Sequence, residues 1–319
     1  MAKKFRLFHC CDLHGSEKCW RKFLRAAEYY NCDAVIAAGD LTGKVIIPII
    51  ETKPGQYVIR IFGRIEKFKE DKLEKWKKTI RDSGYYPWMM TKEEVEEVKD
   101  DPQKQDEIFS KVMEAEMARW VKMADEIVPK GKLVIANPGN DDRFVVDEQI
   151  LESERVIYPL HRVVELGGTY QMVSCEWVNP TPWDSPRECS EEELEKKIRK
   201  EINRLDDFEN AIFNFHAPPK GTGLGTCPKL DTSVKPPKPV TRFLRPVYTD
   251  AGSVAVRKVI DEFQPLLGLH GHIHESKGKY KLGRTMVFNA GSEYTSGILH
   301  GIILTLEPGR LVQYMPVEA

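Results

Sequence analysis

The sequence predicts an α/β fold, because apolar runs typical of β-strands alternate with helical segments along most of its 319 residues. A first strand over residues 5–11 leads to a helix over residues 17–30, with Ser16 as its expected N-cap, and then to the strand 34–38. Such a βαβ unit brings the carboxyl ends of its strands together, which is where open α/β sheets place their ligands.

The later elements continue this alternation and finish as a meander without helices. One charged helix begins after Ser190, with Glu193 in the position of a capping box, and another helix covers residues 253–263. The predicted strands are residues 132–136, 171–175, 211–215, 266–270, 286–289, 297–306 and 310–314.

Two segments interrupt the pattern. Residues 43–130 form an insertion or cap that we expect to be helical, because residues 67–127 are dense in Lys and Glu with helical periodicity and Thr91 with Glu94 forms a capping box. The aromatic and thioether cluster within residues 85–90 is interpreted either as the core of this insertion or as a lid over a substrate. Residues 218–246 are rich in Gly, Pro and Lys, and are expected to be a loop that forms a substrate wall. We therefore expect a single domain, residues 1–319, with this insertion.

Five polar clusters follow predicted strands in a fixed order. The clusters are Asp12-Leu13-His14, Gly39-Asp40, Gly139-Asn140-Asp141-Asp142, His216 and Gly271-His272-Ile273-His274. Each cluster alone is weak evidence: a Gly-Asp pair is usually a turn, and His270 extends the last cluster into three alternating histidines that would suit one face of an ordinary strand. Their joint order is what indicates a function.

The clusters supply the ligands that two divalent metal ions need. Two such ions can hold a water and the phosphoryl oxygens together, and they require a bridging carboxylate. Asp40 is the natural bridge, and Asp12 and His14 lie two apart in an extended segment, so that both would reach one ion. The oxygen and nitrogen ligands suit Mn, Fe, Zn, Co or Ni without choosing among them.

These residues resemble the calcineurin-like metallophosphoesterase superfamily over the span from Asp12 to His274, and more loosely its Icc-type branch, which is related to cyclic-nucleotide phosphodiesterases. The looser likeness rests on residues 181–183, 215–219, 264–265, 271–275 and 289–292. The resemblance implies a four-layered sandwich of two mixed sheets flanked by helices. It also implies two metal ions, one held by Asp12, His14, Asp40 and His274 and the other by Asp40, Asn140, His216 and His272.

One position departs from that family, which usually has a histidine where this chain has Asp141. A carboxylate ionised at neutral pH cannot donate a proton to a leaving group, and its charge would penalise monoesters more than diesters. Asp141 and Asp142 would alternatively orient ligands such as His216, or Asp141 would point away. Arg143 is a candidate phosphate contact. His161 or His300 would be other proton donors, although the sequence places neither near the site.

The general properties suit a cytoplasmic enzyme. The net charge of −1 gives no bulk attraction to nucleic acid, and no apolar run has the ~18 residues of a membrane span. We expect neither nucleic acid nor a membrane as a partner, and free thiols for the seven cysteines. The predicted function is a metal-dependent, for example manganese-dependent, phosphodiesterase that uses a metal-activated water on a small phosphoester. The alternatives are a phosphomonoesterase, protein phosphatases included, and a metal-binding scaffold without catalysis.

Overall fold

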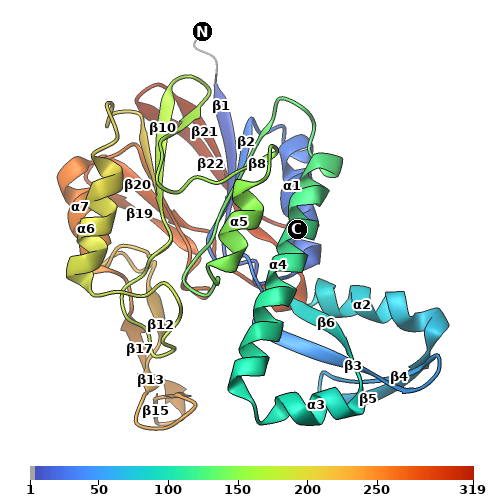
Figure 1. The fold of residues 1–319 in the computed structure, drawn as a ribbon. Coiled ribbons are helices and arrows are strands. Elements are labelled where there is room, and N and C mark those ends of the chain that lie inside the picture. Colours follow the sequence, from blue (N-terminus) through green and yellow to red (C-terminus); the bar gives the residue numbers. More distant parts are fainter. Residues whose placement is uncertain (1–3) are drawn as a thin grey trace.

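Two six-stranded mixed sheets form the body of the protein in a computed structural model that describes residues 4–319 (Figure 1). The first sheet is ordered β22 (Arg310–Glu318), β21 (His300–Glu307), β1 (Phe5–Cys10), β2 (Ala34–Ala38), β7 (Leu133–Asn137) and β8 (Val156–Ile157). The second sheet is ordered β19 (Gly278–Leu282), β20 (Thr285–Asn289), β18 (Leu267–His270), β11 (Ala211–Phe215), β10 (Tyr170–Cys175) and β9 (Val164–Leu166).

Helices cover both outer faces of this pair of sheets. On one side lie α1 (Glu17–Tyr29), α4 (Pro102–Ile127) and α5 (Val145–Leu151), and on the other lie α6 (Glu191–Ile202) and α7 (Val254–Phe263) (Figure 1). One apolar core lies between the two sheets. A second lies between the first sheet and its helices, and a third lies between the second sheet and its helices. Three cores require four layers, so the predicted four-layered sandwich is confirmed.

The first βαβ unit forms as the sequence predicts. Ser16 caps α1 by accepting a hydrogen bond from the Cys19 backbone N–H, and β1 pairs in parallel with β2. The buried Trp20 of α1 stacks on Trp120 of α4, with ring centroids 4.8 Å apart, and donates its indole N–H to the Trp120 carbonyl at 3.0 Å. The end of the insertion is thereby packed against the sandwich.

The insertion is helical only in part, which corrects our expectation. It contains a four-stranded sheet ordered β5 (Arg64–Lys69), β4 (Gln56–Ile61), β3 (Val45–Lys53) and β6 (Tyr85–Met90), together with η1 (Glu70–Lys72), α2 (Leu73–Asp82) and α3 (Lys92–Lys99). The alternating apolar residues of β3 and β4 bury one face against α2, a period-2 signal that the Lys and Glu content of the segment obscures.

The aromatic cluster within residues 85–90 is largely core. Tyr86 is buried against α4, and its hydroxyl accepts a hydrogen bond from the Gly43 backbone N–H at 2.6 Å, while Tyr85 packs with the apolar side chains under α2. Met89 is the exposed member. The interpretation of this cluster as the core of the insertion is therefore the one that the packing supports.

The predicted loop after His216 instead contains short strands. We call residues 226–250 the arm; it consists of three antiparallel pairs, formed by β12 (Thr226–Pro228) with β17 (Tyr248–Asp250), β13 (Leu230–Asp231) with β14 (Lys238–Pro239), and β15 (Thr241–Arg242) with β16 (Arg245–Pro246). Gly and Pro hide such short pairs from a propensity argument. The arm and the insertion project from the same end of the sandwich (Figure 1).

The connection between β20 and β21 contains η2 (Tyr294–Ser296), a single 3-10 turn. Within residues 4–319 no helix is both long and apolar enough to cross a bilayer.

Candidate metal centre

The five clusters meet at one end of the sandwich, where the strands that precede them end side by side. Asp12 and His14 follow β1, Asp40 follows β2, and Asn140 follows β7, all in the first sheet. His216 follows β11, and His272 and His274 follow β18, in the second sheet. The site therefore lies between the carboxyl edges of the two sheets.

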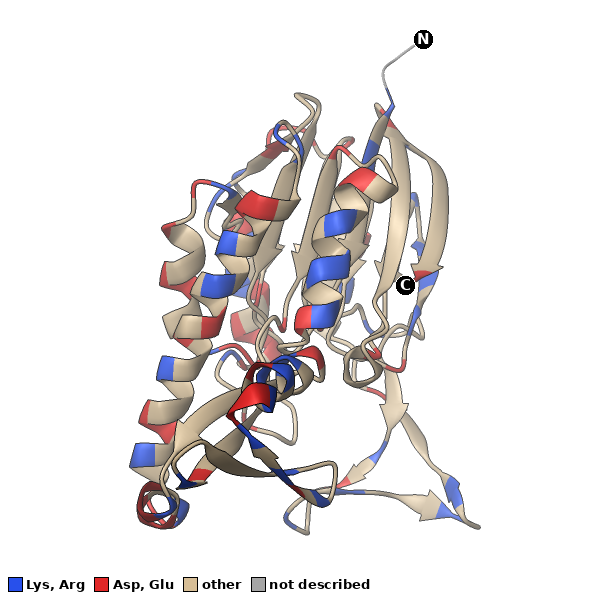
Figure 2. Ribbon diagram, turned by 90° about the vertical axis from the view of Figure 1, so that its right-hand side faces the viewer, with Lys and Arg blue, Asp and Glu red and all other residues tan. Residues whose placement is uncertain are grey.

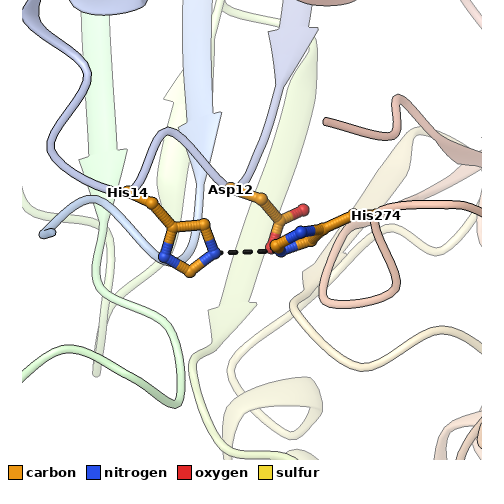
Figure 3. A group of neighbouring side chains, drawn as sticks. All are labelled: Asp12, His14 and His274. Atoms are coloured by element: carbon orange, nitrogen blue, oxygen red, sulfur yellow. Dashed lines mark hydrogen bonds and ion pairs between the residues drawn. The ribbon is translucent and has the colours of Figure 1, made fainter. Parts of the chain in front are cut away.

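Asp12, His14 and His274 form the first group of potential ligands (Figure 3). The Nε2 atoms of His14 and His274 lie 2.9 Å apart, and the His274 Nε2 lies 3.7 Å from a carboxylate oxygen of Asp12. Ligand atoms about 2.0–2.2 Å from one ion are roughly 3 Å from each other, so this spacing suits a shared cation.

Asp40, His216 and His272 form the second group. The His216 Nε2 lies 3.3 Å from Asp40 Oδ2 and 3.1 Å from the Asn140 side-chain oxygen. Asp40 Oδ2 also lies 3.7 Å from the His14 Nε2, which places this carboxylate between the two groups. Asp40 thus lies within reach of both groups, and its role as a bridging ligand stays a prediction.

The backbone at the site is strained. Asp12, His14, Asp40 and His272 all have φ between 41° and 68°, a region that non-glycine residues rarely adopt. The side chains of Asp12 and His14 thus meet because the chain turns sharply after β1, and the extended geometry that we expected for them does not occur. The chain turns in the same way after β18, and His274 therefore lies in the first group of potential ligands while His272 lies in the second.

Glycines let the backbone approach the ligands closely. A Cβ atom on Gly39 would lie 2.0 Å from the His216 ring, and one on Gly139 would lie 2.3 Å from Asp40 Oδ1. Larger residues at these two positions would push the ligands apart.

The donor set fits divalent metal ions. Burial lowers the pKa of His14 well below its usual range and that of His272 to about 3, so both rings are neutral and have a free lone pair. His216 donates from Nδ1 to the Ala38 carbonyl at 3.1 Å, which leaves its Nε2 for a metal, and the Asp12 carboxylate accepts the His272 backbone N–H at 3.0 Å.

The orientation of Asn140 also suits a ligand. Its side-chain NH₂ donates to Asp141 Oδ1 at 3.1 Å and to the Ser185 hydroxyl at 2.8 Å, and its oxygen therefore faces His216. His270 is different: its Nδ1 donates to the Phe215 carbonyl at 2.8 Å, it is fully buried, and it belongs to neither group. The alternating triplet of histidines thus contains one structural residue and two potential ligands.

Asp141 faces the site. One of its carboxylate oxygens lies 4.0 Å from the His14 Nδ1 and contacts the Lys44 ammonium, an ion pair that the sequence analysis did not predict. Burial and the charge of Asp40 raise the pKa of Asp141 to about 7, although Lys44 opposes the shift. This environment corrects the expectation of a fully ionised carboxylate, and it depends on contacts between loops that the sequence pattern does not show.

Asp142 has a structural position. Its buried carboxylate accepts hydrogen bonds from the backbone N–H groups of Leu41, Thr42 and Gly139 at 2.7–2.9 Å and from the Thr42 hydroxyl. It joins the loop after β2 to the loop after β7, and so holds Asp40 and Asn140 in register. Among the described residues no hydrogen bond joins it to His216, the ligand that one of our alternatives had it orient.

Arg143, His161 and His300 lie apart from the ligand groups. The Arg143 guanidinium bonds Asp106 at 2.7 Å and the Ser110 hydroxyl at 2.9 Å on α4, so a phosphate contact would require these bonds to break. His161 lies 3.3 Å from Glu201, and His300 lies 3.7 Å from Glu293. The packing thus gives no support to a catalytic role for these three residues.

A cavity of about 670 Å³ opens over the two groups. Residues 227–230 and Pro239 line it, and they belong to the segment 218–246 that we expected to form a substrate wall. Lys44 and Asn179, which we did not assign to the site from the sequence, also line it, as does the loop around Trp183. Tyr294 packs against the His14 ring with centroids 4.7 Å apart. Only the folded chain brings these residues to the ligands, because they come from separate loops.

Comparisons with known proteins agree with this architecture. No family model matches the chain. A segment of 164 residues, 49% of this chain, is 30% identical to an uncharacterized protein of Methanocaldococcus jannaschii and covers 62% of that protein's length. The fold is similar to a solved structure with a TM-score of 0.59 and 14% identity, covering 99% of both chains. It is also similar to a protein of Thermus thermophilus with a TM-score of 0.53 and 13% identity, covering 98% of this chain and 99% of that one.

Solved structures with lower scores include a dimetal phosphatase from Danio rerio, with a TM-score of 0.45 and 8% identity, covering 98% of both chains. The two likenesses with TM-scores of 0.59 and 0.53 show the fold of the chain, and the resemblance to the calcineurin-like metallophosphoesterase superfamily stays a prediction. The finer resemblance to the Icc-type branch stays a prediction.

The hydrogen bonds of Asp142 predict a structural effect for its replacement. Asp142→Ala leaves three backbone donors without their acceptor, and we expect the free energy of unfolding to fall by at least about 3 kcal/mol in urea titrations. Asp125→Ala, on the exposed face of α4, is the matched control and should change it by less than about 0.5 kcal/mol. Unchanged stability with lost turnover would instead make Asp142 a catalytic group.

The protonation of His216 predicts how metal binding depends on pH. Burial alone would lower its pKa, but the charge of Asp40 raises the pKa to about 9, so the metal-free ring carries a proton at neutral pH. A metal must displace that proton, and we expect Mn²⁺ affinity to rise from about pH 6 to about pH 8 with proton release. Calorimetry in buffers of different ionisation enthalpy measures the Mn²⁺ affinity and the number of protons released. An affinity that stays constant across this pH range would contradict the protonated state of His216.

Proposed function

We propose that the chain is a dinuclear-metal-dependent phosphoester hydrolase and, within that class, a phosphodiesterase. The observation that carries the proposal is the meeting of seven potential oxygen and nitrogen ligands in two adjacent groups, with Asp40 between them. Four of the seven line the cavity, namely Asp40, Asn140, His272 and His274. Two divalent ions held there would supply Lewis acidity and activate a water for attack on phosphorus.

The chain itself would position the ester. Asp40, held by the Asp141 backbone N–H at 3.0 Å, and Asn140, held through its amide, keep both ligand groups in a fixed relation. The cavity walls also contain apolar groups, namely Pro182 and Trp183 of one loop and Leu230 of the arm. Such walls suit the organic groups of an ester and exclude bulk water from it.

The charge balance of the cavity supports a diester. Among its described lining residues the cations are Lys44 and Lys229, and Lys44 already pairs with Asp141. A diester carries one negative charge and a monoester up to two, so a cavity with few free cations favours the diester. Arg143, which would have added a cation, is bound to α4.

One observation favours a phosphomonoesterase as the second candidate. With its pKa raised to about 7, Asp141 carries a proton on part of the molecules at neutral pH and would then supply the acid that the family's histidine provides. A monoester with a poor leaving group needs such an acid, so the two candidates differ in substrate and in the role of Asp141.

We expect the Mn²⁺-loaded protein to hydrolyse bis-p-nitrophenyl phosphate faster than p-nitrophenyl phosphate. Asp40→Asn should lower kcat/KM by at least about a hundredfold, since even the outer partners of metal ligands are worth 10–100-fold. Release of p-nitrophenol at matched substrate concentrations measures both reactions. A preference for the monoester would favour the second candidate, and no turnover with any of several metals would favour a scaffold.

The contact between Lys44 and Asp141 predicts a rescue experiment. Lys44→Met removes the charge that lowers the pKa of Asp141, so the carboxylate is ionised without its counter-ion beside the anionic ester only at alkaline pH, and we expect kcat/KM for bis-p-nitrophenyl phosphate at about pH 9 to fall about tenfold or more. Adding Asp141→Asn removes the repulsive charge and should recover most of the loss. A double variant no better than Lys44→Met would show that Lys44 acts on the ester directly.

A further inference from the structure

The arm ends in an apolar turn between two arginines. In the last antiparallel pair Arg242 faces Arg245, and Phe243 and Leu244 form the two-residue turn between them. The side chains of Phe243 and Leu244 are 89% and 98% exposed, and both residues have positive φ, of 49° and 62°. Turns of this type normally contain Asn and Gly, so local geometry does not account for two large apolar residues here. The Arg242 guanidinium lies over the Phe243 ring, 5.8 Å from its centroid, and leaves most of that ring exposed.

A second hairpin repeats this chemistry on the insertion. Phe62 lies in the turn between β4 and β5 and Ile65 follows it, and their side chains are 62% and 64% exposed. Arg60 and Arg64 flank Phe62, and Arg60 is directly opposite Ile65 in the register of the two strands. An aromatic and an aliphatic side chain beside two arginines therefore occur at two separate places.

Both hairpins belong to the segments that project from the metal-binding end of the sandwich. Figure 1 shows α2 on the side of the insertion sheet nearer the sandwich, so the opposite face of β4 and β5, which carries Arg60 and Ile65, is directed away from the sandwich, as the arm is. The base of the arm lines the cavity over the ligands. A flat partner that bound the hairpins would therefore lie on the side where the cavity is found.

The charge of these segments favours an anionic partner. The arm contains five Lys or Arg residues and two Asp residues, and the β4–β5 hairpin, residues 56–69, contains four cationic residues and one acidic residue, in a chain whose net charge is −1. Figure 2 shows Lys and Arg positions on the segments that project beyond the sandwich. Within residues 4–319 the side chains of Arg60, Arg64, Arg242 and Arg245 form no ion pair, so their charges are available.

We propose that the two hairpins dock the protein on an anionic lipid surface, with Phe243 and Leu244 inserted among the lipids and the arginines at the headgroups. Apolar side chains gain free energy by entering the acyl region, and each nearby cation adds attraction to an anionic leaflet. A nucleic acid would gain from stacking on the two aromatic rings but not from Leu244 or Ile65. We expected no membrane partner because the sequence has no apolar run long enough to span a bilayer. Binding at the surface of a membrane does not require such a run.

Sedimentation with vesicles tests the proposal on the full-length, Mn²⁺-loaded protein. We expect binding to vesicles of phosphatidylcholine mixed with phosphatidylserine, weak binding to phosphatidylcholine alone, and loss of binding at high salt. The variant Phe243→Asn with Leu244→Gly removes the apolar tip and installs the residues that such a turn prefers, so the arm keeps its fold. It should weaken binding by about tenfold or more, and Arg242→Gln with Arg245→Gln should do the same.

A matched control tests whether vesicle binding depends on Phe243 and Leu244 or on exposed apolar side chains in general. Tyr29→Ser with Leu151→Ser removes one aromatic and one leucine, 81% and 59% exposed, from α1 and α5, and should leave binding unchanged. Hydrolysis of bis-p-nitrophenyl phosphate in solution should be equal in all three variants, so failure of the docking proposal is distinguishable from failure of the proposed enzyme. Absence of vesicle binding, or equal binding by the tip variants, would overturn the proposal, as would tip-dependent binding to an oligonucleotide or tip-dependent dimerisation without vesicle binding.

Discussion

The position of one carboxylate determines much of this structure. Asp40 lies between two groups of potential ligands that come from different sheets, and the distances from its Oδ2 atom to His14 and His216 are 3.7 and 3.3 Å. Buried groups of opposite and like charge in so small a volume are costly unless cations compensate them. The two sheets must therefore be held in a fixed relation at this edge, and the large apolar core between them provides that relation.

The loops around Asp40 show how the fold holds this arrangement. Asp142 ties the loop after β2 to the loop after β7, while glycines at 39 and 139 let the backbone pass within contact distance of the ligands. Positive φ angles at four potential ligands show that the local chain conformation is set by the site and not by local preference. Such backbone strain persists only where the surrounding packing enforces it, and here the packed, buried strands on either side of each turn do so.

The electrostatics of the site differ from what single residues suggest. Asp141 stands where the family that the sequence resembles has a histidine, yet burial, Asp40 and Lys44 together give it a pKa of about 7, near that of an imidazole. The residue at this position thus differs from the family's while the protein retains a group that titrates near neutrality. Lys44 enters this balance from the start of the insertion, which links the inserted segment to the chemistry of the site.

The segments beyond the sandwich were the least predictable part of the chain, and the site within it was the most predictable. The apolar residues of β3 and β4 carry a strand period, but the charged helices around them dominate composition, and the short ladders of the arm lie within a Pro-rich stretch that favours a loop. These strands form because they pair with neighbouring strands, and the intrinsic preferences of single residues do not describe that pairing. The sequence by itself determined the α/β class, the order of the clusters and the candidate ligands Asp12, His14, Asp40, Asn140, His216, His272 and His274, because each follows an apolar strand whose period is a local property. Only the tertiary structure decided that His270 is structural, that Asp142 binds backbone, that Arg143 turns to α4 and that Lys44 meets Asp141. These roles depend on which side chains from distant loops come within a few ångströms. Packing between layers sets those distances, and no local pattern in the chain encodes them.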